Sequence, residues 1–327
     1  MDFIQSIINN FIHPPVLFFA LGLVAVLLKS DLEIPPQIGK YLSLYLLFHI
    51  GILGGEELFH SGFNATIIQV MLACIAFSFF IPFFLYRILR FKLDINNAGA
   101  IAATYGSISA VTFVTATSFL EAHHIHFDGY MVAGMALMES PAIIAGLIIV
   151  KFALNKTDES SQTRMSKVFH EAFTNGSVLL LIGSMVIGYI CGVSGEQELK
   201  PFVGDIFKGM LCLYMLDMGL IAGSKLGALK ESGAFLSTFA LAYPPLAALL
   251  GIAAAKLIGL DVGNALLLTI LVASASYIAV PAAMRLAVPQ ANMSLLLPMS
   301  LGLTFSLNVT LGIPLYYVVI ERLLKSL

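Results

Sequence analysis

The chain has 327 residues, of which 59% are hydrophobic and only 11% are charged. Soluble domains carry charge on roughly a quarter of their residues, so this composition excludes a soluble enzyme and a disordered chain. The formal net charge is only −2, and no basic surface is present to bind a nucleic acid. With a mean hydropathy of +0.94, we expect an all-α integral membrane protein.

A transmembrane helix needs about 20 apolar residues to cross about 30 Å of hydrocarbon. We expect ten such helices, at residues 12–28, 41–56, 65–86, 98–119, 129–153, 172–193, 206–224, 233–257, 264–287 and 293–320. The polar, Ser/Thr-rich stretch at 152–170 separates five segments from the next five.

Lys and Arg residues in short loops predict the orientation of the helices. If the N-terminus lies outside, most of the 17 Lys and Arg residues fall in inside loops. We therefore expect a multi-pass protein of the cell inner (plasma) membrane, with both termini outside and a cytoplasmic linker at 152–170.

An internal repeat relates the two halves at an offset of about 168 residues. In the second and seventh segments, Gly51 aligns with Gly219 and Gly55 with Gly223. Five segments is an odd number, so the two halves would insert with opposite orientation, as in secondary transporters that work by alternating access. The expected units are a first five-helix repeat at 1–151, the linker at 152–170 and a second five-helix repeat at 171–327.

Motifs of other protein classes are absent from the sequence. It has no G-x-x-x-x-G-K-[ST] loop for ATP, and no H-E-x-x-H or G-x-S-x-G motif of a hydrolase. We therefore expect a transporter that is not an enzyme and is not driven directly by ATP.

Two symmetry-related segments, 104–117 and 273–281, place small hydroxyl residues at the middle of a membrane span. Gly106 in one and Pro281 in the other permit a broken or bent helix. Freed backbone amides and hydroxyls can bind an anion at the N-terminus of a half-helix. The alternative is that these residues only pack between helices or bond to their own backbone. The candidate substrate-binding residues are Gly106, Ser107, Ser109, Thr112, Ser274 and Ser276.

Glu139, followed by Ser140 and Pro141, is an acid at mid-membrane depth. Such residues usually face a cavity or carry an ion or proton. Glu139 would ligate Na⁺ or carry a coupling proton, with Ser140 beside it and Asn308 in the corresponding region of the tenth segment. The alternative is a protonated Glu139 that bonds to a neighbouring helix.

His49 and Asp217 occupy equivalent places in the second and seventh segments. An ion pair between them, a role in proton coupling and a role in gating are all compatible with this placement.

At these residues the chain resembles the sodium-dependent bicarbonate transporter family, known best from cyanobacteria. The resemblance runs over essentially the whole chain. It is carried by Gly51, Gly54 and Gly55, by the stretch from Gly106 to Thr112, by Met138, Glu139 and Pro141, by Ala273 to Arg285, and by Val288 to Asn292. The chain departs from the family pattern in the ninth segment, where Tyr277 stands at the position of an Asp.

The resemblance implies ten helices in a 5+5 inverted repeat, with a gate domain of helices 1, 2, 6 and 7 and a core domain of helices 3–5 and 8–10. It also implies a homotrimer, Na⁺ as coupling ion and a PII-like regulator at the cytoplasmic face. The leading interpretation is Na⁺-coupled symport of bicarbonate or a similar small anion. The alternatives are an H⁺-coupled transporter of another small solute and a non-transporting membrane sensor or scaffold.

Overall fold

The computed structural model describes residues 12–61, 64–154, 176–225 and 229–325, and these residues form helices and connecting loops without a β-strand. Seven helical segments are long and apolar enough to cross a membrane, and three shorter apolar helices accompany them at Pro14–Leu27, Leu179–Gly192 and Val262–Ala273. Each of the ten predicted ranges overlaps one of these segments, but only seven of the segments are long enough to be membrane spans, and Val262–Ala273 covers only part of the predicted range 264–287. The predicted linker at 152–170 lies, beyond Leu154, outside the described residues.

The first half of the chain contains α2 (Pro14–Leu27), α3 (Pro36–Ser61), α4 (Ala65–Leu89), α5 (Ile95–Gly106), α6 (Ala110–Ala122), α7 (Tyr130–Leu137) and α8 (Glu139–Leu154). The second half contains α10 (Gly176–Lys200), η1 (Pro201–Asp205), α11 (Phe207–Lys225), α12 (Leu229–Ile258), α13 (Val262–Ala273), α14 (Ala279–Ala287), η3 (Met293–Leu295), η4 (Pro298–Phe305), η5 (Asn308–Gly312) and α15 (Ile313–Lys325).

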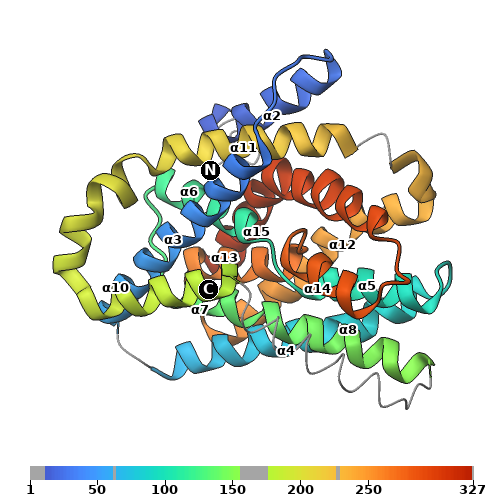
Figure 1. Ribbon diagram of the computed structural model, residues 1–327. Helices are drawn as coiled ribbons and strands as arrows, with labels where there is room; N and C mark the ends of the chain where they lie inside the picture. Colours follow the sequence, from blue (N-terminus) through green and yellow to red (C-terminus); the bar gives the residue numbers. More distant parts are fainter. Residues whose placement is uncertain (1–11, 62–63, 155–175, 226–228, 326–327) are drawn as a thin grey trace.

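Helices from the first half of the chain pack against helices from the second half. The most extensive contacts join α3 to α10 and α2 to α11, so each of these pairs combines one helix from each half. In Figure 1, α3 and α10 lie on the left, and α4 and α8 run along the lower edge. The short helix α5 packs against α4 and α8, and α13 packs against α12 and α15.

The buried helices α5 and α13 begin and end alike. Each has 12 residues. The side chain of Asp94 caps α5 by accepting backbone N–H bonds, and Asp261 caps α13 in the same way. Such N-caps satisfy N–H groups that have no partner inside the helix. Each helix is then followed by a C-cap serine with extended backbone, Ser107 after α5 and Ser274 after α13.

Glycine allows α2 and α11 to approach each other closely. A Cβ atom on Gly219 would collide with the backbone carbonyl oxygen of Phe19, and one on Gly22 would collide with the carbonyl oxygen of Leu216. Small residues at such contacts let helix backbones meet, as is common between membrane helices.

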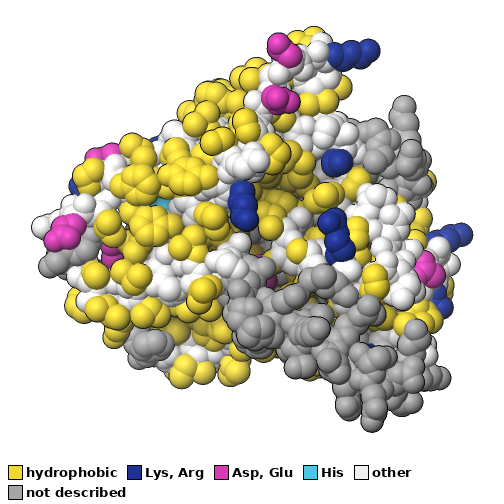
Figure 2. Space-filling view, viewed as in Figure 1, with side chains coloured by type: hydrophobic (Ala, Val, Ile, Leu, Met, Phe, Trp, Pro, Cys, Tyr) yellow, Lys and Arg dark blue, Asp and Glu magenta, His cyan; other side chains and the backbone are white. Residues whose placement is uncertain are grey.

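The outer surface is largely apolar. Figure 2 shows hydrophobic side chains over much of one face, with a few charged side chains between them. On α4, the large side chains of Leu72, Phe80 and Phe84 are exposed, and on α12 those of Leu246 and Leu249 are exposed. An exposed apolar surface of this kind is typical of a membrane-facing protein.

Candidate functional site

Two helices are interrupted at the predicted hydroxyl clusters. The first break separates α5, which ends at Gly106, from α6, which begins at Ala110. The second separates α13, which ends at Ala273, from α14, which begins at Ala279. Pro281 does not itself break the helix, because it lies in the first turn of α14, where its missing N–H has no helical partner to lose.

The two breaks contact each other directly. The backbone N–H of Ser276 donates to the carbonyl oxygen of Thr104 at 2.9 Å. The backbone N–H of Ser109 donates to the hydroxyl oxygen of Ser274 at 3.1 Å. Hydrogen bonds therefore join the two breaks, which are far apart in the sequence, at the point where both helices are interrupted.

One tyrosine caps the C-terminal ends of both interrupted helices. The hydroxyl of Tyr243, on α12, lies 2.7 Å from the carbonyl oxygen of Tyr105 and 3.0 Å from that of Val272. Carbonyls at a helix end have no helical partner and must be satisfied elsewhere. Here one hydroxyl hydrogen is shared between a carbonyl of α5 and a carbonyl of α13.

Asn308, predicted as an ion-coupling residue, has a similar capping position. Its amide Nδ2 donates to the carbonyl oxygen of Ala273 at 2.8 Å, and its Oδ1 accepts a bond from the hydroxyl of Tyr316 at 3.2 Å. Both ends of the amide thus bond to the protein, and Asn308 does not line the cavity described below.

Serines from the breaks accept hydrogen bonds from the first turns of α6 and α14. Ser109 is the N-cap residue of α6, and Ser276 lies two residues before Ile278, the N-cap residue of α14. The hydroxyl of Ser109 accepts from the N–H of Thr112 at 3.1 Å, and the hydroxyl of Ser276 accepts from the N–H of Val280 at 3.2 Å. A serine hydroxyl that accepts such a bond can still donate its own hydrogen to another acceptor. Helix N-termini carry partial positive charge, so both ends favour a nearby anion.

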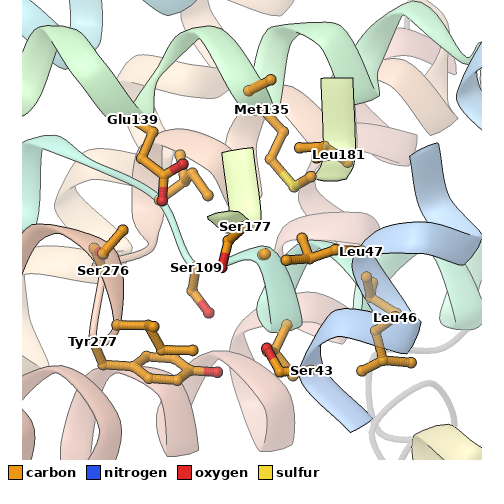
Figure 3. Close-up of a pocket in the computed structure, with 17 residues that line it drawn as sticks. Ser43, Leu46, Leu47, Ser109, Met135, Glu139, Ser177, Leu181, Ser276 and Tyr277 are labelled. Carbon is orange, nitrogen blue, oxygen red and sulfur yellow. The ribbon is translucent and has the colours of Figure 1, made fainter. Parts of the chain in front are cut away.

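A cavity lies where these ends meet (Figure 3). It comprises about 640 Å³ of space not filled by atoms, including space open to solvent. Ser109, Ser276, Tyr277 and Glu139 line one part of it. The other part is lined by α3 and α10, through residues such as Ser43, Leu46, Leu47, Ser177 and Leu181.

Glu139 provides the carboxylate of this cavity. It is the first residue of α8, and its side chain points toward Ser276 and Ser109 in Figure 3. The α7–α8 junction is held by the hydroxyl of Ser78, which donates to the carbonyl oxygen of Met138. Ser140, the next residue, is partly buried and does not line the cavity.

The remaining predicted substrate residues lie next to the cavity but do not line it. A Cβ atom on Gly106 would collide with the ring of Pro82, so Gly106 permits α5 to pack on α4. Ser274 bonds to Leu271 and Ser109. Ser107 and Thr112 have buried hydroxyls that form no hydrogen bond in the structure.

His49 and Asp217 do not meet. Nδ1 of His49 donates to the carbonyl oxygen of Val203 at 2.6 Å, and the ring stacks on Phe207 with centroids 3.7 Å apart. Asp217 is buried beside Gly39. A Cβ atom added to Gly39 would collide with the carboxylate of Asp217. Within the described ranges no ion pair joins the two residues.

Of the residues predicted from the sequence, Ser109, Ser276 and Glu139 line the cavity. Other polar groups in or beside the cavity were not predicted. Tyr243 caps both helices, and Tyr277, Ser43 and Ser177 line the cavity. Tyr277 stands at the place where the chain departs from the pattern of the family that it resembles, and this departure is the signal in the sequence that could have pointed to it. Nothing in the sequence around Tyr243 indicates its two partners.

A divalent or transition-metal centre has no support in the described part of the chain, which contains no group of three or more His, Cys, Asp or Glu side chains that could hold a metal ion. Na⁺ prefers oxygen ligands, and the carboxylate of Glu139 with the nearby hydroxyls is an oxygen-rich set. The family model described as the Na⁺-dependent bicarbonate transporter superfamily matches residues 14–321. No curated protein matches the chain.

Proposed function

Because the chain belongs to the Na⁺-dependent bicarbonate transporter superfamily, we propose that it is a secondary active transporter that couples the entry of Na⁺ to that of bicarbonate or a similar small anion. The observation that carries this proposal is the meeting of two helix N-termini and one carboxylate, Glu139, at a single cavity. Such a cavity offers one environment for an anion and one for a cation.

The anion would bind at the N-termini of α6 and α14. Ser109 and Ser276 cap these helices and line the cavity. Their hydroxyl hydrogens and the partial positive charge of two helix ends would replace part of the hydration shell of the anion. The hydroxyls of Ser107 and Thr112 are two further donors that local rearrangement would bring into use.

The cation would bind at Glu139. A carboxylate at this depth in a membrane is costly unless a cation or a proton compensates its charge. Carbonyls of Tyr105, Val272 and Ala273 already accept bonds from Tyr243 and Asn308. Glu139 supplies the carboxylate among the residues that line the cavity. Na⁺ bound there would also reduce the repulsion between Glu139 and the anion.

We further propose the ten-helix, 5+5 inverted repeat with gate and core domains. It is supported by the exchanged pairs α3–α10 and α2–α11 and by the matching lengths, caps and ends of α5 and α13. Alternating access would move the pairs α3–α10 and α2–α11, as the gate domain, against the core domain that contains the two crossed breaks.

Uptake of radiolabelled bicarbonate into proteoliposomes tests the proposal. An inward Na⁺ gradient should accelerate accumulation several-fold over equal Na⁺ on both sides, and a pH gradient alone should not. Accumulation that follows the pH gradient and ignores Na⁺ would support H⁺-coupled transport instead. Absence of uptake of bicarbonate and other small anions by correctly folded protein would favour the sensor or scaffold.

The assembly is proposed on the family resemblance. A homotrimer predicts a protein mass in detergent of three times 35.2 kDa, measurable by light scattering with correction for the detergent. A PII-like regulator would bind at the cytoplasmic face, where the predicted linker at 152–170 lies. Co-purification of such a protein with the wild-type chain, but not with a chain lacking 156–168, would support that partner.

A further inference from the structure

Tyr277 lies in the second break, with its ring packed in the protein and its hydroxyl directed into the cavity (Figure 3). The residue is 7% exposed. Its ring packs edge-on against Phe305, with centroids 5.7 Å apart and an interplanar angle of 70°. Tyr277 is therefore held in place by packing, while its polar end reaches the site.

The hydroxyl of Tyr277 is buried and forms no hydrogen bond of normal geometry in the structure. Its polar neighbours are the hydroxyls of Ser109 and Tyr214, which lie within reach of weak hydrogen bonds to it. Of these two, Ser109 lines the cavity together with Tyr277. A buried hydroxyl without a partner costs roughly 1–3 kcal/mol. Phenylalanine would fill the same space without that cost, so the hydroxyl is explained best by a partner that binds in the cavity.

We propose that Tyr277 donates a hydrogen bond to the transported anion and thereby favours a basic oxyanion over other small anions. This inference rests on the proposed function, because it assigns a ligand to the same cavity. A phenol supplies a hydrogen without adding charge. Hydrogen bonds to charged acceptors are stronger than neutral ones, and a bicarbonate oxygen is a more basic acceptor than an oxygen of nitrate. Tyr277 and Ser109 would thus contact the anion from the two breaks.

Binding of ¹⁴C-bicarbonate to the purified full-length protein tests this role. Tyr277→Phe should raise the Kd for bicarbonate about tenfold, the scale of one hydrogen bond to a charged group. The constant for competition by nitrate should change less than threefold, so the preference for bicarbonate falls. The matched control is Tyr45→Phe, which removes a hydroxyl that donates to the carbonyl oxygen of Phe202 at 2.6 Å and does not line the cavity. The control should bind as the wild type does.

The outcomes separate the two proposals. If wild-type protein binds bicarbonate and Tyr277→Phe binds it within twofold as tightly, the role of Tyr277 is overturned and the proposed function stands. If the wild type binds another small anion but no bicarbonate, the role of Tyr277 is overturned and anion transport stands. If it binds no small anion, both fall. An equal loss for bicarbonate and nitrate would overturn the selectivity.

A measurement that retains the hydroxyl covers the case in which Tyr277→Phe does not fold. A fluorotyrosine placed at position 277 should show a ¹⁹F resonance that shifts on addition of bicarbonate and much less on addition of nitrate. A resonance that does not respond to bicarbonate, in protein that binds it, would overturn the assignment.

Discussion

The backbone N–H of Ser276 donates a hydrogen bond to the carbonyl oxygen of Thr104 at 2.9 Å, and this bond joins one interrupted helix to the other. Because both partners are backbone groups, the contact depends on the path of the chain and not on a rotamer. Movement of α13 would carry α5 with it. We therefore expect the two interrupted helices to move together during transport. The change between inward and outward access would then take place where they contact α3 and α10.

Tyr243 should be important for the stability of this crossing. Tyr243→Phe leaves the carbonyls of Tyr105 and Val272 without their shared donor. Loss of the partner of a buried acceptor costs about 1–3 kcal/mol, so the variant should unfold several degrees below the wild type. The chain has no tryptophan, and circular dichroism is a suitable measurement. A melting temperature equal to that of the wild type would show that other groups satisfy the two carbonyls.

The two capping serines should affect substrate affinity. Ser109→Ala and Ser276→Ala each remove a cap and a hydroxyl that lines the cavity. We expect each to raise the bicarbonate concentration for half-maximal uptake at least fivefold, with about 1 kcal/mol lost from the cap. The control is Ser118→Ala on α6, a buried hydroxyl that does not line the cavity. If all three variants have the wild-type uptake curve, the serines only pack between helices.

Glu139 should determine the coupling ion. Glu139→Gln keeps the size of the side chain and removes its charge. If Glu139 binds Na⁺, the variant should need at least tenfold more Na⁺ for half-maximal uptake or lose transport, because a charged oxygen ligand is gone. If it carries a proton, the wild type should respond to a pH gradient and the variant should not. Unchanged dependence on both ions would make Glu139 a structural residue and shift attention to Asp217.

Two glycines on α11 allow a matched test of the close approach between α2 and α11. Gly219→Ala introduces a Cβ atom that collides with the backbone of Phe19, and we expect a loss of about 1–3 kcal/mol from such overpacking. Gly209→Ala on the same helix meets no atom within 4 Å and should be neutral or stabilising by about 0.5–1 kcal/mol. Equal effects of the two substitutions on thermal unfolding would exclude a tight contact at Gly219.

The proposed orientation predicts which loops are reached from outside the cell. Lys92, before α5, should lie inside, and His126, after α6, should lie outside; both are exposed in the structure. In a variant without the three native cysteines, His126→Cys should react with an impermeant thiol reagent on whole cells. Lys92→Cys should react only after permeabilisation. The reverse pattern would place both termini inside.

Much of the fold can be predicted from the sequence because apolar segments of membrane length and polar exceptions within them are both local signals. The broken stretches at 107–109 and 274–278 follow from small and hydroxyl residues in otherwise apolar segments. The wide π-helical turns η4 and η5 were not predicted. A π-turn depends on a local shift in backbone hydrogen bonding, which the apolar pattern of the tenth segment does not reveal.

The polar groups that line the candidate cavity were predicted less completely than the helices, because the position of a polar side chain depends on what it contacts in the fold. The amide of Asn308 caps α13, although its position in the sequence is equally compatible with ion binding. Tyr243 lies in an apolar helix, and Tyr277 lies in the break between two apolar helices. At either position a tyrosine and a phenylalanine give the same hydrophobic pattern. Only the path of the backbone brings one hydroxyl to two helix ends and the other to the cavity.

The equal length of α5 and α13 has an electrical consequence. Twelve residues in each extend about 18 Å, somewhat more than half of the roughly 30 Å hydrocarbon layer. In the proposed inverted repeat, α5 and α13 enter from opposite membrane surfaces. A charge between their inner ends would then experience about half of the membrane potential, which amounts to roughly 1.2 kcal/mol per 100 mV. A lone anion would change its occupancy about sevenfold with such a voltage. An anion accompanied by one monovalent cation would be nearly indifferent to it, so the voltage dependence of binding reports how many ions share the site.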